Sequence, residues 1–555
     1  MKKEAILHIP MSEYGHGLDE NRVVFRLRAA RGDLTACTFQ YGDRACRNNP
    51  IDFTALPMQI VAWDLHFDYW EVEFETLYRR MCYYFELNDS TETALYYGDA
   101  FHTQISWERS EYFQLPYLHR ANIARAPEWV KDAVIYNIFP DSFATGHKQI
   151  SLIALEKTYK GEKSQSKLGG TIKGITANVD YLLELGINCV YINPFFAAGE
   201  YHKYDLLDYY TVDPCMGTND DFAEMVRTLH DANIRVIIDG VFNHCGWRFF
   251  AFDDVVKNGE ASRYKDWFYR LEYPVIRPDN GDAIPGYECF AYERLMPKLD
   301  TTHPEVREYF FDVCRYWLRE YKIDGWRFDC ADEVDDRFWR DMLTEAQAIN
   351  SEVFIMGEVW HNANHWLDGT MFHSTMNYYF RKHCREFFAL ENTDAAQFNA
   401  GVTNMLLRYR KNMVYAQLNL LDSHDVSRFL SLCNGDTERF KLAILFQMCF
   451  VGAPCIFYGN EQGLMGIRES DYRHHMIWDG DADLFDFYKK AIQLRRTHDA
   501  LRYGNFKTLH AAGRAFIFAR TYNNVTLTVA INAKCPNAGE TLWEGKNFMV
   551  AINHG

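Results

Sequence analysis

Several features that mark common classes of protein are missing from this 555-residue chain. It contains no block of basic residues and has a formal net charge of −17, which argues against nucleic acid and anionic membrane surfaces as partners. No window reaches the roughly 18 consecutive apolar residues of a membrane helix. The apolar stretch near the start is too short for a signal peptide. We therefore expect no membrane association and predict a cytoplasmic protein.

Patterns typical of metal sites and disulfide frameworks are also missing. The fourteen cysteines form no CxxC pair, and the chain has no HExxH motif, which argues against a zinc site or a metal-dependent hydrolase. Without a secretion signal, the cysteines are interpreted as reduced, buried thiols. The sequence also has no internal repeat and no low-complexity segment.

The composition is that of a large folded protein. Hydrophobic residues make up 48% of the chain, enough for large cores, and 24% of the residues are charged. Aromatic residues are frequent at 16%. They suit carbohydrate binding, because the C–H faces of sugars pack on aromatic rings, but they suit a well-packed core equally well.

The hydrophobic pattern changes twice along the chain. From about residue 5 to 120, apolar residues alternate with polar ones in short segments separated by turns, which predicts an antiparallel β-sandwich. From Pro127 the pattern becomes an alternation of strands and helices, typical of an α/β fold. Alternation returns near Phe516, which predicts a small β-domain at the end of the chain.

Within the α/β part, four short apolar segments each end in acidic residues. The carboxyl ends of parallel barrel strands converge on one face, where active sites form, so these residues are expected to meet. We predict eight strands at 133–136, 188–194, about 236–239, near 329, 353–356, near 370–380, 414–420 and 454–458. The acidic and imidazole residues at four of these strand ends are Asp239 with His244, Asp329, Glu358, and His424 with Asp425.

Arg327 and Asp329 are two residues apart, so in a strand their side chains lie on the same face. A cation beside a carboxylate lowers its pKa, and an ionised, oriented Asp can act as a nucleophile. Taken alone, the pair could equally be a structural ion pair. Glu358 precedes Val359 and Trp360, and such an apolar setting raises the pKa of a carboxyl and suits a general acid.

Together with Met296–Asp300, these four stretches resemble the signature regions of the α-amylase family of glycoside hydrolases, in the neopullulanase, cyclomaltodextrinase and maltogenic amylase branch. Five motifs occur in the family's order, and the resemblance covers nearly the whole chain. It implies a (β/α)8 TIM barrel at 123–500 with an inserted subdomain at about 245–300. It further implies an N-terminal β-sandwich at 1–122 and a small C-terminal β-domain at 501–555. The sandwich resembles a starch-binding module, and a packing and dimerisation domain that binds no sugar is the equal alternative.

The resemblance also implies roles for single residues. Asp329 matches the family's nucleophile, Glu358 its acid/base and Asp425 its third carboxylate. The positions that match substrate-binding residues are His244, Arg327, His424, Tyr204, Trp360, Phe290 and Arg473. The chain departs from the usual residues at Ser142, Asp300, Asp332, Asn460 and His474–His475, none of which removes a catalytic group.

The expected function is retaining hydrolysis of α-1,4-glucosidic bonds in cyclodextrins, short maltodextrins and pullulan. Transglycosylation, α-1,6 hydrolysis tuned by Glu333, and a non-catalytic carbohydrate-binding role are the alternatives. No cofactor is expected. Relatives often bind calcium after the first strand, but here residues 143–150 contain no carboxylate, so no tight site is predicted there and a weaker one near Asn243 stays open. The resemblance also implies a homodimer formed through the N-terminal domain.

Overall fold

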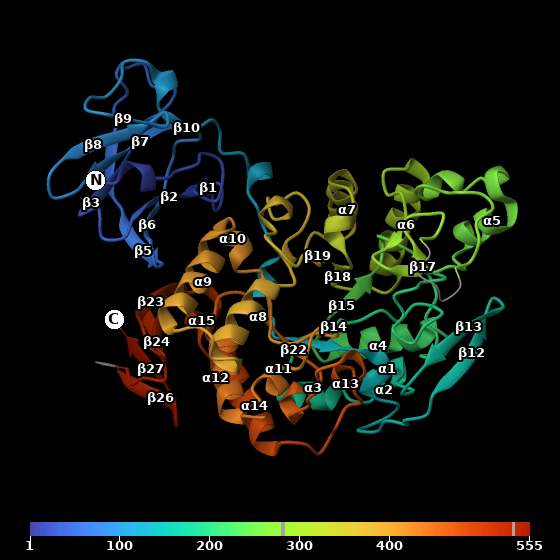
Figure 1. Cartoon of the computed structure of the whole chain (residues 1–555). Helices are drawn as coiled ribbons and strands as arrows, with labels where there is room; N and C mark the ends of the chain where they lie inside the picture. The colour runs from blue at the N-terminus through green and yellow to red at the C-terminus, as the bar shows by residue number, and fades with distance from the viewer. Residues whose placement is uncertain (279–283, 536–538, 555) are drawn as a thin grey trace.

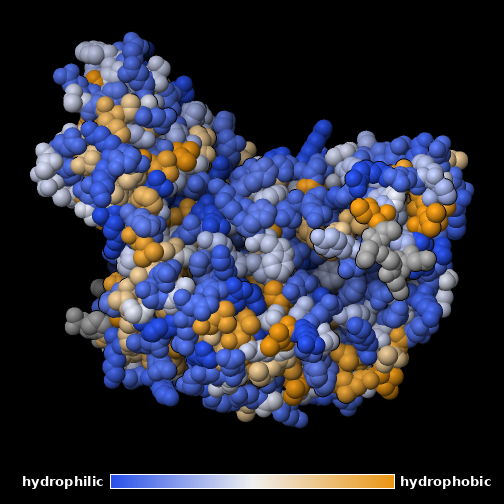
Figure 2. Space-filling model, in the orientation of Figure 1, coloured by the Kyte–Doolittle hydropathy of each residue, from blue (hydrophilic) through white to orange (hydrophobic). Residues whose placement is uncertain are grey.

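The structure is a computed structural model that describes residues 1–278, 284–535 and 539–554. Its chain forms a two-sheet domain at the N-terminus, a central barrel and a C-terminal sheet (Figure 1). The N-terminal domain projects from the rest of the molecule, and the face in view is mostly hydrophilic, with apolar residues in scattered patches (Figure 2). Among the described residues, no helix is both long and apolar enough to cross a membrane.

The N-terminal domain is the predicted antiparallel sandwich. One sheet has the order β1-β2-β6-β5, and the other has the order β4-β3-β7-β8-β9 with β10 paired to β7. Apolar side chains such as Phe25, Phe39 and Phe85 fill the space between the sheets. The strands are β1 (Gly15–Gly17), β2 (Arg22–Ala30), β3 (Ala36–Asp43), β4 (Thr54–Pro57), β5 (Gln59–Trp63), β6 (Phe67–Glu75), β7 (Met81–Asn88), β8 (Thr93–Tyr97), β9 (Ala100–His102) and β10 (Phe113–Leu115).

The central sheet consists of eight parallel strands, which confirms the predicted barrel fold. Its order is β20-β19-β18-β15-β14-β11-β22-β21, and a parallel bridge between Met376 and Leu418 joins the two ends. In chain order the strands are β11 (Ile135–Ile138), β14 (Cys189–Ile192), β15 (Arg235–Gly240), β18 (Gly325–Phe328), β19 (Phe354–Gly357), β20 (Ser374–Thr375), β21 (Leu418–Leu420) and β22 (Ala453–Phe457). The seventh strand is shorter than predicted, because Val414 belongs to helix α10 (Lys411–Val414).

Side chains of the barrel strands alternate between the interior and the surrounding helices. In β15, Ile237 lies in the interior cluster, whereas Val236 and Ile238 pack in the outer core. In β18, Trp326 and Phe328 face outward and stack with their ring centroids 5.7 Å apart. Asp239 and the Arg327–Asp329 pair therefore point into the barrel at its carboxyl end.

Helices surround the barrel, and two insertions extend it (Figure 1). The helices are α1 (Pro140–Phe143), α2 (Ile172–Thr176), α3 (Val179–Leu185), α4 (Asn219–Asp231), α5 (Phe250–Asn258), α6 (Pro304–Glu320), α7 (Asp336–Ile349), α8 (Tyr378–Cys384), α9 (Ala395–Leu407), α11 (Phe429–Leu432), α12 (Thr437–Cys449), α13 (Glu469–Tyr472), α14 (Ala482–Thr497) and α15 (Asp499–Tyr503). The predicted insertion after β15 contains α5 and the hairpin of β16 (Cys289–Phe290) and β17 (Glu293–Pro297). A second hairpin, β12 (Leu155–Tyr159) with β13 (Glu162–Ser166), follows β11 and was not predicted.

The C-terminal part is an antiparallel sheet of order β23-β24-β25-β27-β26. Its strands are β23 (Asn505–Ala512), β24 (Ala515–Tyr522), β25 (Val525–Ile531), β26 (Glu540–Gly545) and β27 (Phe548–His554).

The N-terminal domain contacts the barrel through Lys411, whose ammonium lies 2.9 Å from Glu71 and 2.8 Å from Glu73. The domain boundaries at 122 and 500 remain predictions.

Candidate active site

Arg327 is the centre of the charged groups at the carboxyl end of the barrel. Its side chain is fully buried, and Nη1 donates to Asp239 at 2.8 Å and to Asp329 at 2.7 Å. Nη2 lies 2.9 Å from Glu358 Oε2. One guanidinium therefore fixes three carboxylates, which come from the ends of the adjacent strands β15, β18 and β19.

Asp329 and Glu358 lie close together at the cavity wall. One carboxylate oxygen of each lies within 4.8 Å of the other and of Cys330 Sγ. The backbone N–H of Cys330 donates to Glu358 Oε2 at 3.1 Å, and the indole N–H of Trp360 donates to Oε1 at 3.1 Å. Both oxygens of Glu358 are thus held in place.

The sequence predicted that Arg327 would lower the pKa of Asp329, and Arg327 does act in that direction, but other effects outweigh it. Burial raises the pKa of Asp329 well above its ordinary value, and the charges of Glu358 and Asp239 add to this effect against Arg327. Burial also raises the pKa of Glu358, with a further contribution from Asp425. Two close, buried carboxyls beside one cation favour retention of a single proton between them.

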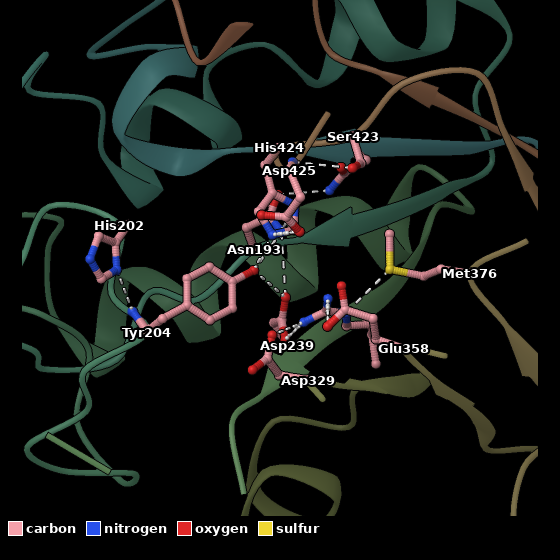
Figure 3. Close-up of polar contacts among 12 residues, drawn as sticks. Asn193, His202, Tyr204, Asp239, Asp329, Glu358, Met376, Ser423, His424 and Asp425 are labelled. Atoms are coloured by element: carbon pink, nitrogen blue, oxygen red, sulfur yellow. Dashed lines mark hydrogen bonds and ion pairs between the residues drawn. The ribbon is translucent and has the colours of Figure 1, made fainter. Parts of the chain in front are cut away.

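Asp425 has the opposite electrostatic setting. Burial acts to raise the pKa of Asp425, but His424, 2.9 Å away, and Arg473, 3.3 Å away, outweigh burial and lower it. Tyr204 lies against the same histidine, because its hydroxyl is 2.5 Å from His424 Nε2 and the two rings stack at 5.4 Å. The hydroxyl also donates to Asp239 at 3.0 Å (Figure 3).

His244 and Phe290 form a second aromatic pair, with their ring centroids 4.7 Å apart and their planes inclined by 17°. Burial, with a contribution from Lys298, lowers the pKa of His244 to about 3, so the ring is neutral at neutral pH. Within the described part of the chain, Nε2 of His244 has no hydrogen-bonding partner although it is buried. Both His244 and Phe290 line the cavity.

Trp360 and Arg473 lie on the rim. Trp360 is 49% exposed and stacks on Tyr378 with a centroid distance of 3.7 Å and an interplanar angle of 6°. Arg473 donates from Nε to the carbonyl of His424 at 2.8 Å and from Nη1 to Glu469 at 2.6 Å. A flat, exposed ring and a fixed guanidinium are groups that bind sugar faces and hydroxyls.

These groups surround one open cavity of about 510 Å³. Eight of the ten residues predicted for the site line it; Arg327 and His424 lie behind its wall, in contact with lining residues. The lining residues that the prediction did not include as site residues are His202, Glu293, Met296, Cys330, Asp332, Glu333 and Glu469. Asn193, which donates to His424 Nδ1 at 3.0 Å, was also missed as a site residue, although it lies in the segment 188–194 that was predicted as the second strand.

Two places in the described chain bear on metal binding. The group Asp329, Cys330 and Glu358 has suitable ligand types, but Arg327 already supplies positive charge there. In the loop after β11, the amide of Asn178 binds the carbonyl of Gly146 at 2.9 Å and the N–H of Lys148 at 2.7 Å. With no carboxylate in this loop, its donor set is poor for calcium.

Known proteins resemble the chain over nearly its full length. A model of the α-amylase catalytic domain matches residues 137–479, and a model of the α-amylase N-terminal Ig-like domain matches residues 1–119. A cyclomaltodextrinase from Geobacillus thermopakistaniensis (strain MAS1) is 39% identical over 540 residues, which is 96% of this chain and 91% of that protein. Neopullulanase 2 from Thermoactinomyces vulgaris is 40% identical over 550 residues, 97% of this chain and 92% of that protein.

A solved structure of a cyclomaltodextrinase superposes with a TM-score of 0.91 at 36% identity, covering 100% of this chain and 98% of that one. The agreement extends to the sandwich and the C-terminal sheet as well as the barrel. The chain therefore belongs to the α-amylase family of glycoside hydrolases.

Proposed function

We propose that this enzyme hydrolyses α-1,4-glucosidic bonds with retention of configuration, with Asp329 as nucleophile and Glu358 as acid/base. The observation that carries the proposal is the closeness of the two carboxyls, whose nearest oxygens lie within 4.8 Å. Retaining glycosidases hold their two carboxyl groups about 5–5.5 Å apart, whereas inverting enzymes need about 6.5–9.5 Å to admit a water molecule.

In the first step, Glu358 gives its proton to the glycosidic oxygen while Asp329 attacks the anomeric carbon from the opposite face. The bond to the leaving sugar breaks, and a β-linked glucosyl ester forms on Asp329. In the second step, Glu358 takes a proton from water, which attacks the same carbon, releases Asp329 and gives an α-product. The raised pKa of Glu358 suits the proton donor of the first step.

The remaining residues have binding roles in this proposal. Asp425, which stays ionised, and His424 bind hydroxyls of the sugar being cleaved, and neutral His244 presents its free Nε2 to the same sugar. Tyr204 lies beneath this sugar, and Trp360 and Phe290 lie beside the leaving part of the chain. Arg473 contacts the donor side.

Substitution of the two carboxyls tests the roles. Asp329→Asn and Glu358→Gln should each lower kcat more than about a thousandfold with little change in melting temperature. Retention of more than about a tenth of the wild-type rate by either variant would contradict the assignment. NMR of the first product formed should show the α-anomer, and an initial β-anomer would indicate inversion.

The substrate is proposed to be a cyclodextrin, a short maltodextrin or pullulan rather than starch. The names of relatives, cyclomaltodextrinase and neopullulanase, support this choice, and a cavity of about 510 Å³ has room for only a few sugar units. The value of kcat/KM for β-cyclodextrin should exceed that for soluble starch. An equal or higher value for starch would refute the proposal.

We also propose a cytoplasmic homodimer with the N-terminal domain at the interface. A relative 37% identical to this chain is named intracellular maltogenic amylase, and a stable interface would bury about 1,600 Å². Light scattering at micromolar concentration should give twice the chain mass of 65.1 kDa. A mass equal to that of one chain would exclude the dimer.

A further inference from the structure

We propose that Lys203 is a positioning residue whose buried contacts with the β12–β13 hairpin hold His202 and Tyr204 in the wall of the active-site cavity. The inference rests on the proposed function, which assigns Tyr204 to the sugar being cleaved. It makes the unpredicted hairpin part of the catalytic apparatus. Lys203 does not line the cavity and is not expected to touch substrate.

The Lys203 side chain is completely buried and paired. Its ammonium lies 2.9 Å from Asp213 Oδ2, and both side chains have 0% exposure. Nζ also donates to the hydroxyl of Ser164 at 3.0 Å and to the carbonyl of Gln165 at 2.7 Å. The ammonium therefore has three oxygen partners and no contact with solvent.

Asp213 and Ser164 are themselves fixed. The Ser164 hydroxyl donates to Asp213 at 2.6 Å, and the N–H groups of Ala198 and Cys215 donate to the same carboxylate at 3.1 and 2.8 Å. The Lys203 side chain thus contacts two chain segments, the hairpin and the loop after β14. A buried charge without its partner is strongly unfavourable, so displacement of the loop away from the hairpin is disfavoured.

The residues on either side of Lys203 face the opposite way. His202 and Tyr204 both line the active-site cavity, and the N–H of Tyr204 donates to His202 Nδ1 at 3.1 Å (Figure 3). Lys203 itself has a φ of 64°, in the left-handed region that non-glycine residues rarely adopt. Its buried contacts offset this unfavourable backbone conformation, which turns the two neighbours toward the site.

The hairpin is anchored at a second point, at the end of the first barrel strand. The hydroxyl of Ser166 donates to the buried carboxylate of Asp141, which also accepts from the N–H of Lys167 at 3.1 Å. Ser164 and Ser166 are two residues apart in β13 and are both buried, so they lie on one face of the strand. One face of the hairpin thus connects the β11 end to the loop that carries Tyr204.

Tyr204 explains how a displacement at Lys203 would reach the chemistry. Its hydroxyl bonds to Asp239, which shares Arg327 with Asp329, and to His424, which contacts Asp425. Misplacement of a substrate-binding group by about 1 Å can cost about 100-fold in rate.

The test compares Lys203→Met with a matched control on the same hairpin. Lys160 lies 2.7 Å from Asp208, an exposed ion pair in which the lysine side chain is 68% exposed and neither residue lines the cavity. Lys203→Met should lower kcat/KM for a short maltodextrin about tenfold or more, and Lys160→Met should leave it within about twofold. If Lys203→Met does not fold, Ser164→Ala takes its place. This variant keeps the charges of Lys203 and Asp213 and should show a smaller decrease in kcat/KM.

A double-mutant cycle separates positioning from general destabilisation. If Lys203 acts through Tyr204, the loss caused by Lys203→Met should shrink to within about twofold in a Tyr204→Ala background. An equal loss in both backgrounds, or wild-type kcat/KM in Lys203→Met and Ser164→Ala, would overturn the proposal.

Amide hydrogen exchange gives a readout that does not depend on activity. The N–H groups of Gly199 and Glu200 donate to Asp205 at 3.1 and 3.0 Å, closing the loop that contains Lys203. Exchange in residues 199–205 should become faster in Lys203→Met and stay unchanged in Lys160→Met. Unchanged exchange in Lys203→Met would refute the positioning role, whatever the activity of the protein. Failure of the wild-type protein to cleave any α-glucan would instead refute the proposed function.

Discussion

Replacement of Trp360 by Phe should move the alkaline limit of activity to higher pH. The indole N–H donates to Glu358 Oε1 at 3.1 Å while the ring stacks on Tyr378. Phe keeps a flat ring for this stack but cannot donate. A hydrogen bond to a carboxylate stabilises its ionised form, so removal of the donor raises the pKa of Glu358.

The size of the shift follows from the strength of the bond. A hydrogen bond to a charged group contributes about 1.5–3 kcal/mol, and since Trp360 is 49% exposed, about 1 kcal/mol is a reasonable value here. Because one pKa unit corresponds to about 1.4 kcal/mol, the expected shift is about 0.5–1 unit upward. The general acid must be protonated, so activity should persist to a correspondingly higher pH.

The assay is the pH dependence of kcat/KM for a short maltodextrin, since this profile reports ionisations of the free enzyme. The matched control is Trp366→Phe, because Trp366 Nε1 has no hydrogen-bonding partner in the described part of the chain. The control should keep the wild-type profile. An alkaline limb that is unchanged or lies at lower pH in Trp360→Phe would refute the reasoning.

Two further predictions concern pH and metal ions. Burial lowers the pKa of six histidines to about 3 or 4. Below about pH 6.5 these histidines take up protons in the unfolded chain but not in the folded protein, so the folded state loses stability as the pH falls from 6.5 toward 4. The loss is about 1.4 kcal/mol for each histidine and each pH unit. Calorimetry should therefore give a lower melting temperature at pH 5.5 than at pH 7.5, and equal values would contradict the assignment. These histidines are His8, His16, His202, His244, His373 and His383. Chelation should leave the melting temperature unchanged, because the loop at 143–150 lacks carboxylates; a large decrease reversed only by calcium would show a site that we did not expect.

Much of the fold could be predicted because its pattern is local. Apolar segments that end in Asp239, Asp329 and Glu358 indicated strands of a parallel barrel, and the structure brings these three residues to one guanidinium. The β12–β13 hairpin was missed because its segments, such as Glu162–Ser166, are mostly polar and lack the apolar alternation of a half-buried strand.

Long-range electrostatics could not be predicted from neighbouring residues. Arg327 suggested a low pKa for Asp329, but burial and the charge of Glu358, from the next strand, act in the opposite direction. The burial of Lys203 likewise depends on Asp213 and Ser164, which are distant in sequence. The residues next to Lys203 in the sequence do not indicate that its side chain is buried, and the packed hairpin shows that it is.

The most direct test of the account is to trap the intermediate on Asp329. A 5-fluoro-α-glucosyl fluoride transfers its sugar to the nucleophile of a retaining α-glucosidase and releases fluoride. Hydrolysis of the resulting fluoroglucosyl-enzyme is slow, so this intermediate accumulates. Mass spectrometry of a digest should find one fluoroglucosyl group, attached to the peptide at Asp329 and missing in Asp329→Asn. Attachment to Glu358, Asp425 or another carboxylate, or complete inactivation without label on Asp329, would contradict the central claim.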